Sequence, residues 1–335
     1  MTDKNEGTDW KEETPSPQPP RRVSIVVPLQ DEASSVVPLL DSITRQSTAP
    51  DEIVLVDAGS RDETAALVLD YHTNVPLKLV AAGRVYPGVA RNAGVAAASG
   101  EWIAFTDAGI TLERHWLREL IAHVEGGVGA VCGSYDPVCD SFFKECAAVA
   151  YIPSLGPEGT RGLSVASLLV SRATFESTGG FPAFRASEDL IFLESLRRVT
   201  TLGFAPRAVA NWQMQGKAAT TFRRFVLYSR HNLAAGRARY WHLGIAQLYL
   251  ALAVAIALTA GAGMLRLGVV LVPAFFLARA LKAAVTKMKS FPFNTLHPLR
   301  VAGAAAILLV VDCATAFGAL TWLLKLPAPT PEPRR

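Results

Sequence analysis

Short apolar runs alternate with helical patterns along the first two thirds of the chain. Four apolar runs of four or five residues predict buried strands at 23–27, 53–56, 77–81 and 102–106. Apolar residues spaced three or four apart predict helices between these strands, at 34–46, 62–71 and 88–98. Strands that alternate with helices in this way are typical of an α/β fold with parallel strands.

The middle of the chain continues this pattern less regularly. It predicts a helix at 112–124, strands at 130–133 and 166–170, and helices at 172–177 and 189–200. Asp62 is expected to cap the helix that begins with it. Basic and aromatic residues interleave in 220–239, which predicts a basic helix at a membrane interface, with a solvated helix closing the domain as the alternative.

Apolar segments of membrane length occupy the last third. Segment 243–265 carries no charge and is long enough to cross about 30 Å of hydrocarbon. Segment 267–278 is shorter and spans only if Arg279 and Lys282 face the interface or the helix bundle. Segment 301–324 contains Asp312, for which Arg279 is a candidate partner. We therefore expect three spans, with two spans and a re-entrant middle segment as the alternative.

These patterns divide the chain into five parts. An α/β domain is expected at 22–212, a basic amphipathic segment at 213–241 and a membrane region of about three helices at 242–326. The two remaining parts are polar, Pro-rich tails at 1–21 and 327–335, of which the first is expected to be disordered because it lacks apolar residues to bury. Basic loops next to the spans place the α/β domain in the cytoplasm of a multi-pass cell-membrane protein, by the positive-inside rule.

Composition and charge support this division. Hydrophobic residues make up 50% of the chain and the mean hydropathy is +0.25, which is high for a soluble domain. Between Glu194 and Asp312 there are fifteen Lys and Arg and no acidic residue. This bias favours an anionic membrane surface or a phosphate-bearing substrate over a nucleic acid, because no nucleic-acid module accompanies it. The four cysteines form no C-x-x-C pair, which argues against a zinc site, and no cleaved signal peptide is expected.

Polar side chains follow three of the predicted strands. The first strand is followed by Pro28 to Glu32, the second ends at Asp57, and the fourth ends at Asp107. In open α/β sheets, ligands bind at these carboxyl ends, near the point where the strand order reverses. Carboxylates there can hydrogen-bond a ribose or a base, or hold a metal that carries a diphosphate.

The order and spacing of these segments resemble the inverting glycosyltransferases of family 2. The resemblance includes Arg91-Asn-Ala-Gly94 and Ser187-Glu188-Asp189 and extends from Val23 to about Arg239. It implies the GT-A fold, a Rossmann-like mixed sheet with helices on both faces, here followed by C-terminal transmembrane helices. It also implies a nucleotide-sugar donor and makes 22–212 the catalytic domain.

The resemblance assigns a role in donor binding to six residues: Pro28, Glu32, Asp57, Arg84, Arg91 and Asp107. Pro28, Glu32 and Asp57 correspond to segments that hold the nucleobase and ribose in the family. The alternative for Asp57 is a plain strand-to-helix turn. Arg84 and Arg91 are candidates for binding the diphosphate, since a guanidinium offers paired donors; a structural ion pair is the alternative for Arg91.

A divalent cation, Mg²⁺ or Mn²⁺, is implied at Asp107. In the family the corresponding motif is usually Asp-x-Asp, but here Gly109 replaces the second Asp. One protein carboxylate together with the donor diphosphate is expected to bind the cation less tightly than two.

Catalysis is assigned by resemblance to Asp189 as general base, with Glu188 as its neighbour. A carboxylate at a helix N-terminus is favoured as an anion, and simple helix capping is the alternative role. The Gln-x-x-Arg-Trp motif of processive members is absent after this helix, which favours transfer of a single sugar to a membrane lipid or a lipid-linked saccharide.

Two other functions are weighed against this one. A degenerate homologue that binds nucleotide or lipid without catalysis is the alternative that Gly109 suggests. A dinucleotide-dependent oxidoreductase is disfavoured because Pro-Leu-Gln-Asp-Glu, and not Gly-x-Gly-x-x-Gly, follows the first strand.

Overall fold

The computed structural model describes residues 22–240, 242–261 and 265–326, so both expected tails and Trp241 lie outside the described residues. Within the described part, eight strands form one sheet in the order β3-β2-β1-β4-β7-β6-β8-β5. The strands are β1 (Val23–Leu29), β2 (Glu52–Asp57), β3 (Leu77–Ala81), β4 (Trp102–Phe105), β5 (Ile110–Leu112), β6 (Ala130–Val138), β7 (Leu168–Ser171) and β8 (Leu202–Gln213).

The sheet is mixed, as expected. Strands β3, β2, β1 and β4 are parallel neighbours, and β7 inserts antiparallel between β4 and β6. Strand β6 pairs in parallel with β8, which pairs antiparallel with β5. The carboxyl ends of β1, β2 and β4 therefore meet at one edge, where the predicted polar residues lie.

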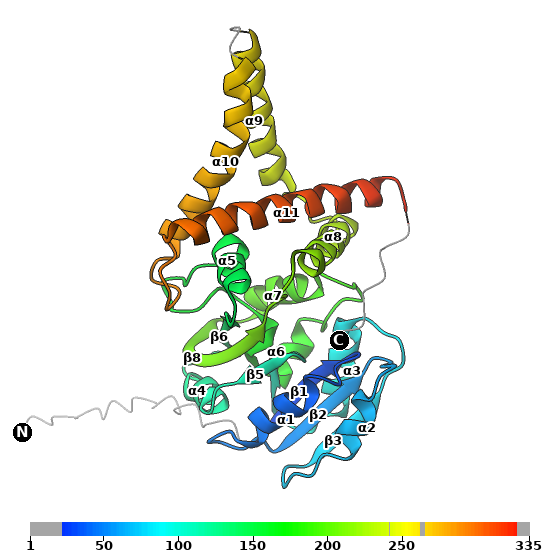
Figure 1. The fold of residues 1–335 in the computed structure, drawn as a ribbon. Helices are drawn as coiled ribbons and strands as arrows, with labels where there is room; N and C mark the ends of the chain where they lie inside the picture. The colour runs from blue at the N-terminus through cyan, green and yellow to red at the C-terminus, as the bar shows by residue number, and fades with distance from the viewer. Residues whose placement is uncertain (1–21, 241, 262–264, 327–335) are drawn as a thin grey trace, which may run out of the picture.

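Helices cover both faces of the sheet (Figure 1). The helices are α1 (Val36–Thr44), α2 (Thr64–Leu69), α3 (Pro87–Ala97), α4 (Trp116–Ala122), α5 (Phe142–Tyr151), α6 (Arg172–Ser177), α7 (Glu188–Val199), α8 (Ala218–Ala234), α9 (His242–Gly261), α10 (Leu265–Thr286) and α11 (Pro298–Leu323). Alternate residues of β1 point to opposite sides: Ile25 and Val27 pack with α1 and α4, while Val26 packs with α3 and α7. Each face thus has its own apolar core.

Strands β5 and β8 and helix α5 were not predicted from the sequence, and the start of α4 was misplaced. Strand β8 was not expected, because Pro206 interrupts its apolar pattern; the pairing with β6 shifts register there, between Gly133 and Ser134. Helix α5 was also not expected. The helix expected at 112–124 begins only at Trp116, because Ile110–Leu112 pairs with β8.

The expected cap at Asp62 is wrong in detail. Helix α2 begins at Thr64, with Glu63 at the N-cap position. The side chain of Glu63 forms no capping hydrogen bond with the helix. Asp62 still accepts a hydrogen bond from the backbone nitrogen of Thr64, at 3.1 Å, so it orders the turn before the helix and not the helix end itself.

The C-terminal helices form two groups (Figure 1). Helices α9 and α10 form a hairpin that projects away from the sheet, and α11 runs across the base of that hairpin, where it packs on α5 and α8. By length and composition, two described segments are apolar enough to cross a membrane: His242–Ala260, with a mean hydropathy of 2.1, and Pro298–Leu323, with 2.0. Half of the second segment is buried within the protein, whereas the first is not buried.

Asp312 joins the three helices. Its carboxylate accepts hydrogen bonds from Arg279 of α10, which confirms the expected partner. It also accepts one from the hydroxyl of Tyr249 of α9, at 3.0 Å, which the sequence did not predict. Asp312 is 3% exposed, so this ion pair satisfies a charge that would otherwise be buried among apolar side chains.

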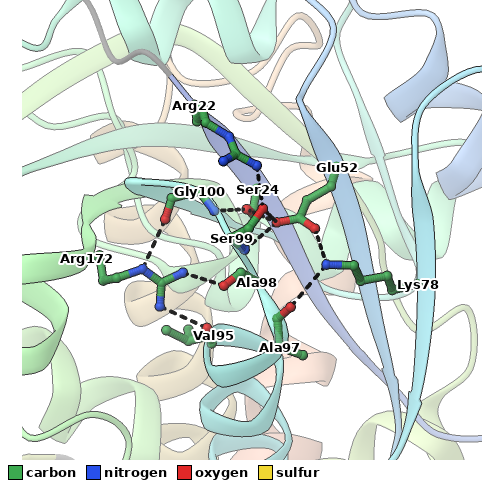
Figure 2. A network of polar contacts seen from close by, with 10 residues as sticks. All are labelled: Arg22, Ser24, Glu52, Lys78, Val95, Ala97, Ala98, Ser99, Gly100 and Arg172. Atoms are coloured by element: carbon green, nitrogen blue, oxygen red, sulfur yellow. Dashed lines mark hydrogen bonds and ion pairs between the residues drawn. The ribbon is translucent and has the colours of Figure 1, made fainter.

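A polar network anchors the amino-terminal edge of the sheet, opposite the strand ends just described (Figure 2). Glu52 of β2 accepts hydrogen bonds from Ser24, Ser99 and Lys78, at 2.5–2.8 Å. Arg172 donates to the backbone carbonyls of Val95, Ala98 and Gly100, at and just after the C-terminal end of α3. The network fixes one end of α3, whose other end contributes to the site described below.

Replacing Glu52 by Gln is expected to lower stability by about 1–3 kcal/mol at neutral pH. Burial opposes ionisation of Glu52, but hydrogen bonds from Lys78, Ser24 and Ser99 outweigh it and lower its pKa from 4.5 to about 2. The folded-state pKa is lowered, so the stabilisation is present above pH 4.5 and is lost as the pH falls toward 2. Thermal unfolding of the two proteins should therefore differ at pH 7 and converge in acid. Glu101→Gln, at an exposed position nearby, is the control and should show no such difference.

Candidate functional site

A cleft of about 1000 Å³ opens at the carboxyl ends of β1 and β4. Its walls come from the loops after these strands and from helices α3, α7 and α8. It contains seven of the eight residues that the sequence analysis selected: Pro28, Glu32, Arg84, Arg91, Asp107, Glu188 and Asp189. Residues from Pro28 to Asp189, far apart in the sequence, are thus brought to one site.

Asp57 is the selected residue that does not line the cleft. It ends β2 beside Leu29 of β1, and its carboxylate accepts a hydrogen bond from the backbone nitrogen of Ser60, at 2.9 Å. Gly59 in this turn has a φ of 81°, a conformation that glycine adopts without strain. Asp57 therefore orders a turn at the rim, where the neighbouring Ala58 lines the cleft, and contact with a nucleotide stays a prediction.

The loops after β1 and β2 are tied together along this rim. The backbone nitrogen of Asp31 donates to Ser60 Oγ, and the Asp31 carboxylate accepts from the backbone nitrogen of Arg61. Glu32 is 5% exposed, its backbone nitrogen donates to Thr64 Oγ1, and its carboxylate accepts from Ser35 Oγ.

The backbone at Asp31 has a φ of 54°, a region that Asn and Asp enter more readily than other residues with a side chain. This geometry explains why an Asp is tolerated at this position of the turn. It also makes the rim a preformed surface, since the turn is held by side-chain hydrogen bonds from the neighbouring loop.

Arg91 is the electrostatic centre of the site. It projects from α3, is 5% exposed, and donates to Asp107 at 2.5 Å and to Glu188 at 3.2 Å. Its guanidinium carbon lies 5.3 Å from the centre of the Phe181 ring. Burial disfavours its charge, but Asp107 and Glu188 outweigh this and raise the pKa of Arg91. Arg91 therefore forms the structural ion pair that was the alternative to its role in diphosphate binding, and its two partners are also residues selected from the sequence.

The residues around Arg91 explain its sequence motif. Asn92 accepts from the backbone nitrogen of Phe181 and donates to its carbonyl, which holds the loop that precedes α7. Gly94 lets α3 approach β1, since a Cβ there would lie 2.4 Å from a methyl carbon of Val26. Gly88 likewise admits Glu188, whose Cγ would lie 2.9 Å from an added Cβ. Gly88, Arg91, Asn92 and Gly94 thus each have their own packing or hydrogen-bonding reason.

Glu188 and Asp189 form the first turn of α7. The helix follows Ser187, which has a φ of 72° and is hydrogen-bonded to Asn232 of α8. Two of the three described non-glycine residues with positive φ, Asp31 and Ser187, line the cleft. Backbone strain of this kind concentrates at functional sites, where surrounding contacts enforce it.

Both carboxylates have raised pKa values. For Glu188, burial raises the pKa, Arg91 lowers it and Asp189 raises it again, to about 7. For Asp189, burial raises the pKa, Arg91 opposes and Asp107 adds to the rise. Among the described residues Asp189 has no ion-pair partner, and its Oδ1 accepts from the backbone nitrogen of Leu190. Of the two, Asp189 is the more accessible from the cleft, since Glu188 is 6% exposed and paired.

The pH dependence of activity should report this carboxylate pair. Below about pH 7, Glu188 becomes protonated and no longer neutralises Arg91, so turnover should fall as the pH decreases through 7. Glu188→Gln should remove this part of the profile, because the amide does not titrate. The measurement is kcat/KM against pH for both proteins; an unchanged acid limb in the variant would assign it to another group.

Several residues that line the cleft were not selected from the sequence. Arg185 precedes the Ser187-Glu188-Asp189 motif by two positions, which is the signal that could have identified it. Trp212 lies at the end of β8, the strand that the sequence analysis missed, and Tyr228 lies on α8.

Arg84, which was selected, is exposed and without an ion-pair partner among the described residues, so its charge faces the cleft unneutralised.

The described residues do not form a metal site by themselves. No group of three or more His, Cys, Asp or Glu side chains suited to a metal ion occurs in the described part of the chain. Asp107, the predicted ligand, is bound by Arg91, and the turn after it uses Gly109 with a φ of 78°. A cation at this position would need oxygen ligands from a bound substrate.

Comparison with known proteins identifies the type of domain. Residues 24–149 match the family model described as glycosyl transferase family 2. The chain is 36% identical over 104 residues to the succinoglycan biosynthesis protein ExoO of Rhizobium meliloti, covering 31% of this chain and 30% of that protein. It is 34% identical over 108 residues to a PGL/p-HBAD biosynthesis glycosyltransferase of Mycobacterium bovis, covering 32% and 41%. The matched segment thus spans well under half of each relative.

The fold as a whole is similar to a solved structure. The mannosyltransferase PcManGT from Pyrobaculum calidifontis, in complex with GDP-Man and Mn²⁺, aligns with a TM-score of 0.54 and 21% identity, covering 92% of this chain and 88% of that chain. This similarity confirms the expected GT-A arrangement, a mixed sheet with helices on both faces.

Proposed function

Residues 24–149 belong to glycosyltransferase family 2, and on this premise we propose that the chain transfers a sugar from a nucleotide-diphospho-sugar to an acceptor at a membrane, with inversion at the anomeric carbon. The observation that carries the proposal is the cleft in which Asp189, at the start of α7, lies with Arg91, Asp107 and Glu188. This cleft contains a candidate base, Asp189, and a cation, Arg91, that is paired with two carboxylates, and it has space for a nucleotide.

The donor occupies the part of the cleft between β1 and α3. Pro28 and Glu32 form one wall for the nucleoside, with the turn at Asp57 behind them, and the free guanidinium of Arg84 faces the diphosphate. A diphosphate is recognised by cationic groups that are able to form ion pairs with its oxygen atoms. The structurally similar mannosyltransferase was solved with GDP-Man, which is consistent with a nucleotide-sugar in this position.

Asp189 acts as general base in a single displacement. It accepts the proton of the acceptor hydroxyl as that oxygen forms a bond to C1 of the sugar, and the bond from C1 to the diphosphate oxygen breaks on the opposite side. The nucleoside diphosphate leaves with the electron pair, so the configuration at C1 inverts. The raised pKa of Asp189 suits this role, because a stronger base accepts the proton more readily at neutral pH.

Glu188 and Arg91 are positioning residues in this scheme. Arg91 holds Asp107 and Glu188 on either side of the reaction centre and lowers the cost of gathering three carboxylates there. A divalent cation at Asp107 stays a prediction. The similar mannosyltransferase contains Mn²⁺, but the residues here do not fit a preformed metal site, so no step of the proposed mechanism depends on a cation.

The C-terminal helices hold the cleft at a membrane. The sequence analysis expected three spans; from the arrangement of the helices we propose that α9 and α10 enter the bilayer as a hairpin and that α11 lies along the membrane surface. Helix α11 runs across the hairpin and is half buried on α5 and α8, which leaves only one of its faces for lipid (Figure 1). The α9 segment, with no residue of its apolar window buried, leaves most of its surface for lipid, although it contacts α10 along the hairpin. The basic residues near these helices favour a cytoplasmic side for the catalytic domain.

A second candidate function is binding without catalysis. The observations in its favour are Gly109, where a second acidic residue is usual in the resembled family, and the engagement of Asp107 by Arg91. Such a protein would bind a nucleotide and transfer no sugar from any donor.

The experiment that separates the two functions is a donor screen. The full chain in membranes is incubated with a panel of labelled nucleotide-sugars, and label is measured in the organic extract and in free sugar. Transfer from at least one donor into the lipid fraction is the expected result. Tight nucleotide binding with neither transfer nor hydrolysis, for any donor, would favour the binding protein.

A further inference from the structure

A second cavity of about 200 Å³ adjoins the main cleft. Its walls come from β6, β8, α5 and α8 and are mainly aromatic; we call it the aromatic chamber. Its aromatic side chains are Tyr135, Tyr151, Trp212, Phe225 and Tyr228. The rings of Tyr151 and Phe225 meet edge to face, with centroids 5.0 Å apart. The mechanism proposed above uses none of these residues.

Arg224 stands where the two cavities meet. It lines both of them, together with Tyr135, Trp212 and Tyr228. Its guanidinium carbon lies 5.4 Å from the Trp212 ring centre and 5.6 Å from the Tyr228 ring centre, and its Nε donates to the Tyr228 hydroxyl at 2.7 Å. The aromatic contacts fix the plane of the guanidinium at the mouth of the chamber.

Arg224 has no ion pair among the described residues, although Tyr228 and, more weakly, Tyr151 and Glu32 favour its charge and raise its pKa against the effect of burial. No carboxylate lies within 4.0 Å of it in the part of the chain that the structure describes, and neither terminal nitrogen has a hydrogen-bond partner there. A guanidinium that is partly withdrawn from water without a counter-ion is costly, and an oxyanion that binds both terminal nitrogens would remove that cost. Arg91, in contrast, already has two carboxylate partners.

The sheet order places the chamber away from the donor side. The residues proposed for the nucleotide lie on β1, at the end of β2, and in the loops after β1 and before α3, whereas the chamber residues Tyr135 and Trp212 belong to β6 and β8. Strands β4 and β7 separate the two sides. The carboxylates at β4 and α7 lie on the cleft between them, and Arg224 lines both that cleft, together with Glu32, and the chamber, so it can bind a ligand at the boundary of the two cavities.

The chamber also points toward the C-terminal helices. Tyr151, Trp212 and Phe225 pack against an apolar cluster that includes Phe276 of α10 and Val311 of α11. An apolar chain in the chamber would thus lie next to the helices proposed to contact lipid, with its polar end at the cleft.

We propose that Arg224 binds the oxyanion of an amphiphilic acceptor, a phosphate or a carboxylate, and that the apolar chain of this acceptor occupies the aromatic chamber. The proposal rests on the proposed function, since it names the class of acceptor for the same cleft. It predicts that an anionic head group and an alkyl chain are recognised together, at a site separate from the nucleotide.

The test is equilibrium binding by calorimetry to the purified full chain in a neutral detergent. The probes are hexyl phosphate, hexanoate, inorganic phosphate and neutral hexyl glucoside, with UDP and GDP as donor-site probes. Hexyl phosphate or hexanoate should bind at least tenfold more tightly than inorganic phosphate, and the preferred head group identifies the oxyanion. Arg224→Gln should weaken that binding at least tenfold, and Arg224→Lys should restore part of it.

Two controls separate this site from its surroundings. Arg223→Gln removes the exposed neighbouring charge, which lines neither cavity, and should change binding less than twofold. Gln215→Trp narrows the chamber without altering Arg224. It should weaken the binding of hexyl phosphate but leave the binding of inorganic phosphate unchanged. The second variant keeps the test informative if Arg224→Gln does not fold, which thermal unfolding will show.

Three results would overturn the proposal. The first is loss of UDP or GDP binding in Arg224→Gln with hexyl phosphate binding intact, which would place Arg224 in the donor site. The second is equal binding of hexyl glucoside and hexyl phosphate. The third is an equal loss in Arg223→Gln. None of these measurements requires turnover, so Arg224-dependent binding alongside a failed donor screen would reject the glycosyltransferase while keeping the subsite.

Discussion

Replacing Asp189 by Asn is expected to reduce sugar transfer about 10²- to 10⁴-fold, the usual contribution of a positioned general base. Asp189 lines the cleft, has no ion-pair partner among the described residues and has a pKa raised by burial, so it is the carboxylate best placed to accept a proton from a ligand in the cleft. Asn has nearly the same shape and keeps the hydrogen bond from the backbone nitrogen of Leu190, so nucleotide affinity should change less than about threefold. The measurements are kcat for transfer and Kd for the nucleoside diphosphate.

The matched control is Glu194→Gln on the same helix. Glu194 pairs with Arg237 at the surface and does not line the cleft, so transfer should be unaffected. Full activity in Asp189→Asn would reject Asp189 as the base. A parallel loss of nucleotide binding in that variant would instead mean that the residue holds the donor or the fold of the site.

Replacing Arg91 by Met is expected to abolish transfer and to destabilise the protein by about 3–5 kcal/mol, because it leaves buried carboxylates without their cation. Arg91 is the shared partner of Asp107 and Glu188, and the side chain of Glu188 is 8% exposed. Met fills a similar volume, so the loss is electrostatic and not the result of a cavity. Thermal unfolding at pH 7 measures the change in stability, and the donor assay measures transfer.

Two further variants test the cause of this loss. Arg84→Met removes a charge in the same cleft that has no carboxylate partner, so it should weaken donor binding without lowering the unfolding temperature. In the Arg91→Met background the pKa of Glu188 should rise above 7, so Glu188→Gln should change stability little at pH 7 and restore part of it at higher pH, where the Glu188 carboxylate would otherwise ionise without a partner. If Arg91→Met and Arg84→Met unfold at the same temperature, the ion pairs of Arg91 do not stabilise the fold as we infer.

The sequence predicted the central strands well because their local signal agrees with their environment. Strands β1, β2 and β4 are buried on both faces, so each is a continuous apolar run that ends at a polar residue. Strand β8 has no such run: Pro206 and Arg207 are exposed in its middle, and only its pairing with β6 and β5 makes it a strand. Tertiary pairing, which a single sequence does not display, decided that element.

The site was predictable as a set of residues but not as a set of contacts. Motif order located Arg91, Asp107, Glu188 and Asp189, and the structure brings them together. That Arg91 pairs with both Asp107 and Glu188 depends on α3 and α7 approaching within the space that Gly88 leaves. The pair of Asp312 with Arg279 was anticipated because a lone carboxylate among apolar residues needs a partner, whereas Tyr249 as a third member carried no sequence signal.

The stereochemistry of transfer tests the proposed mechanism most directly. Once a donor is identified, the anomeric configuration of the transferred sugar is read from the coupling constant and chemical shift of its C1 proton, in the product formed before any equilibration. A single displacement assisted by Asp189 predicts a configuration opposite to that of the donor. A product with the configuration of the donor retained would contradict direct attack by the acceptor and with it the role assigned to Asp189.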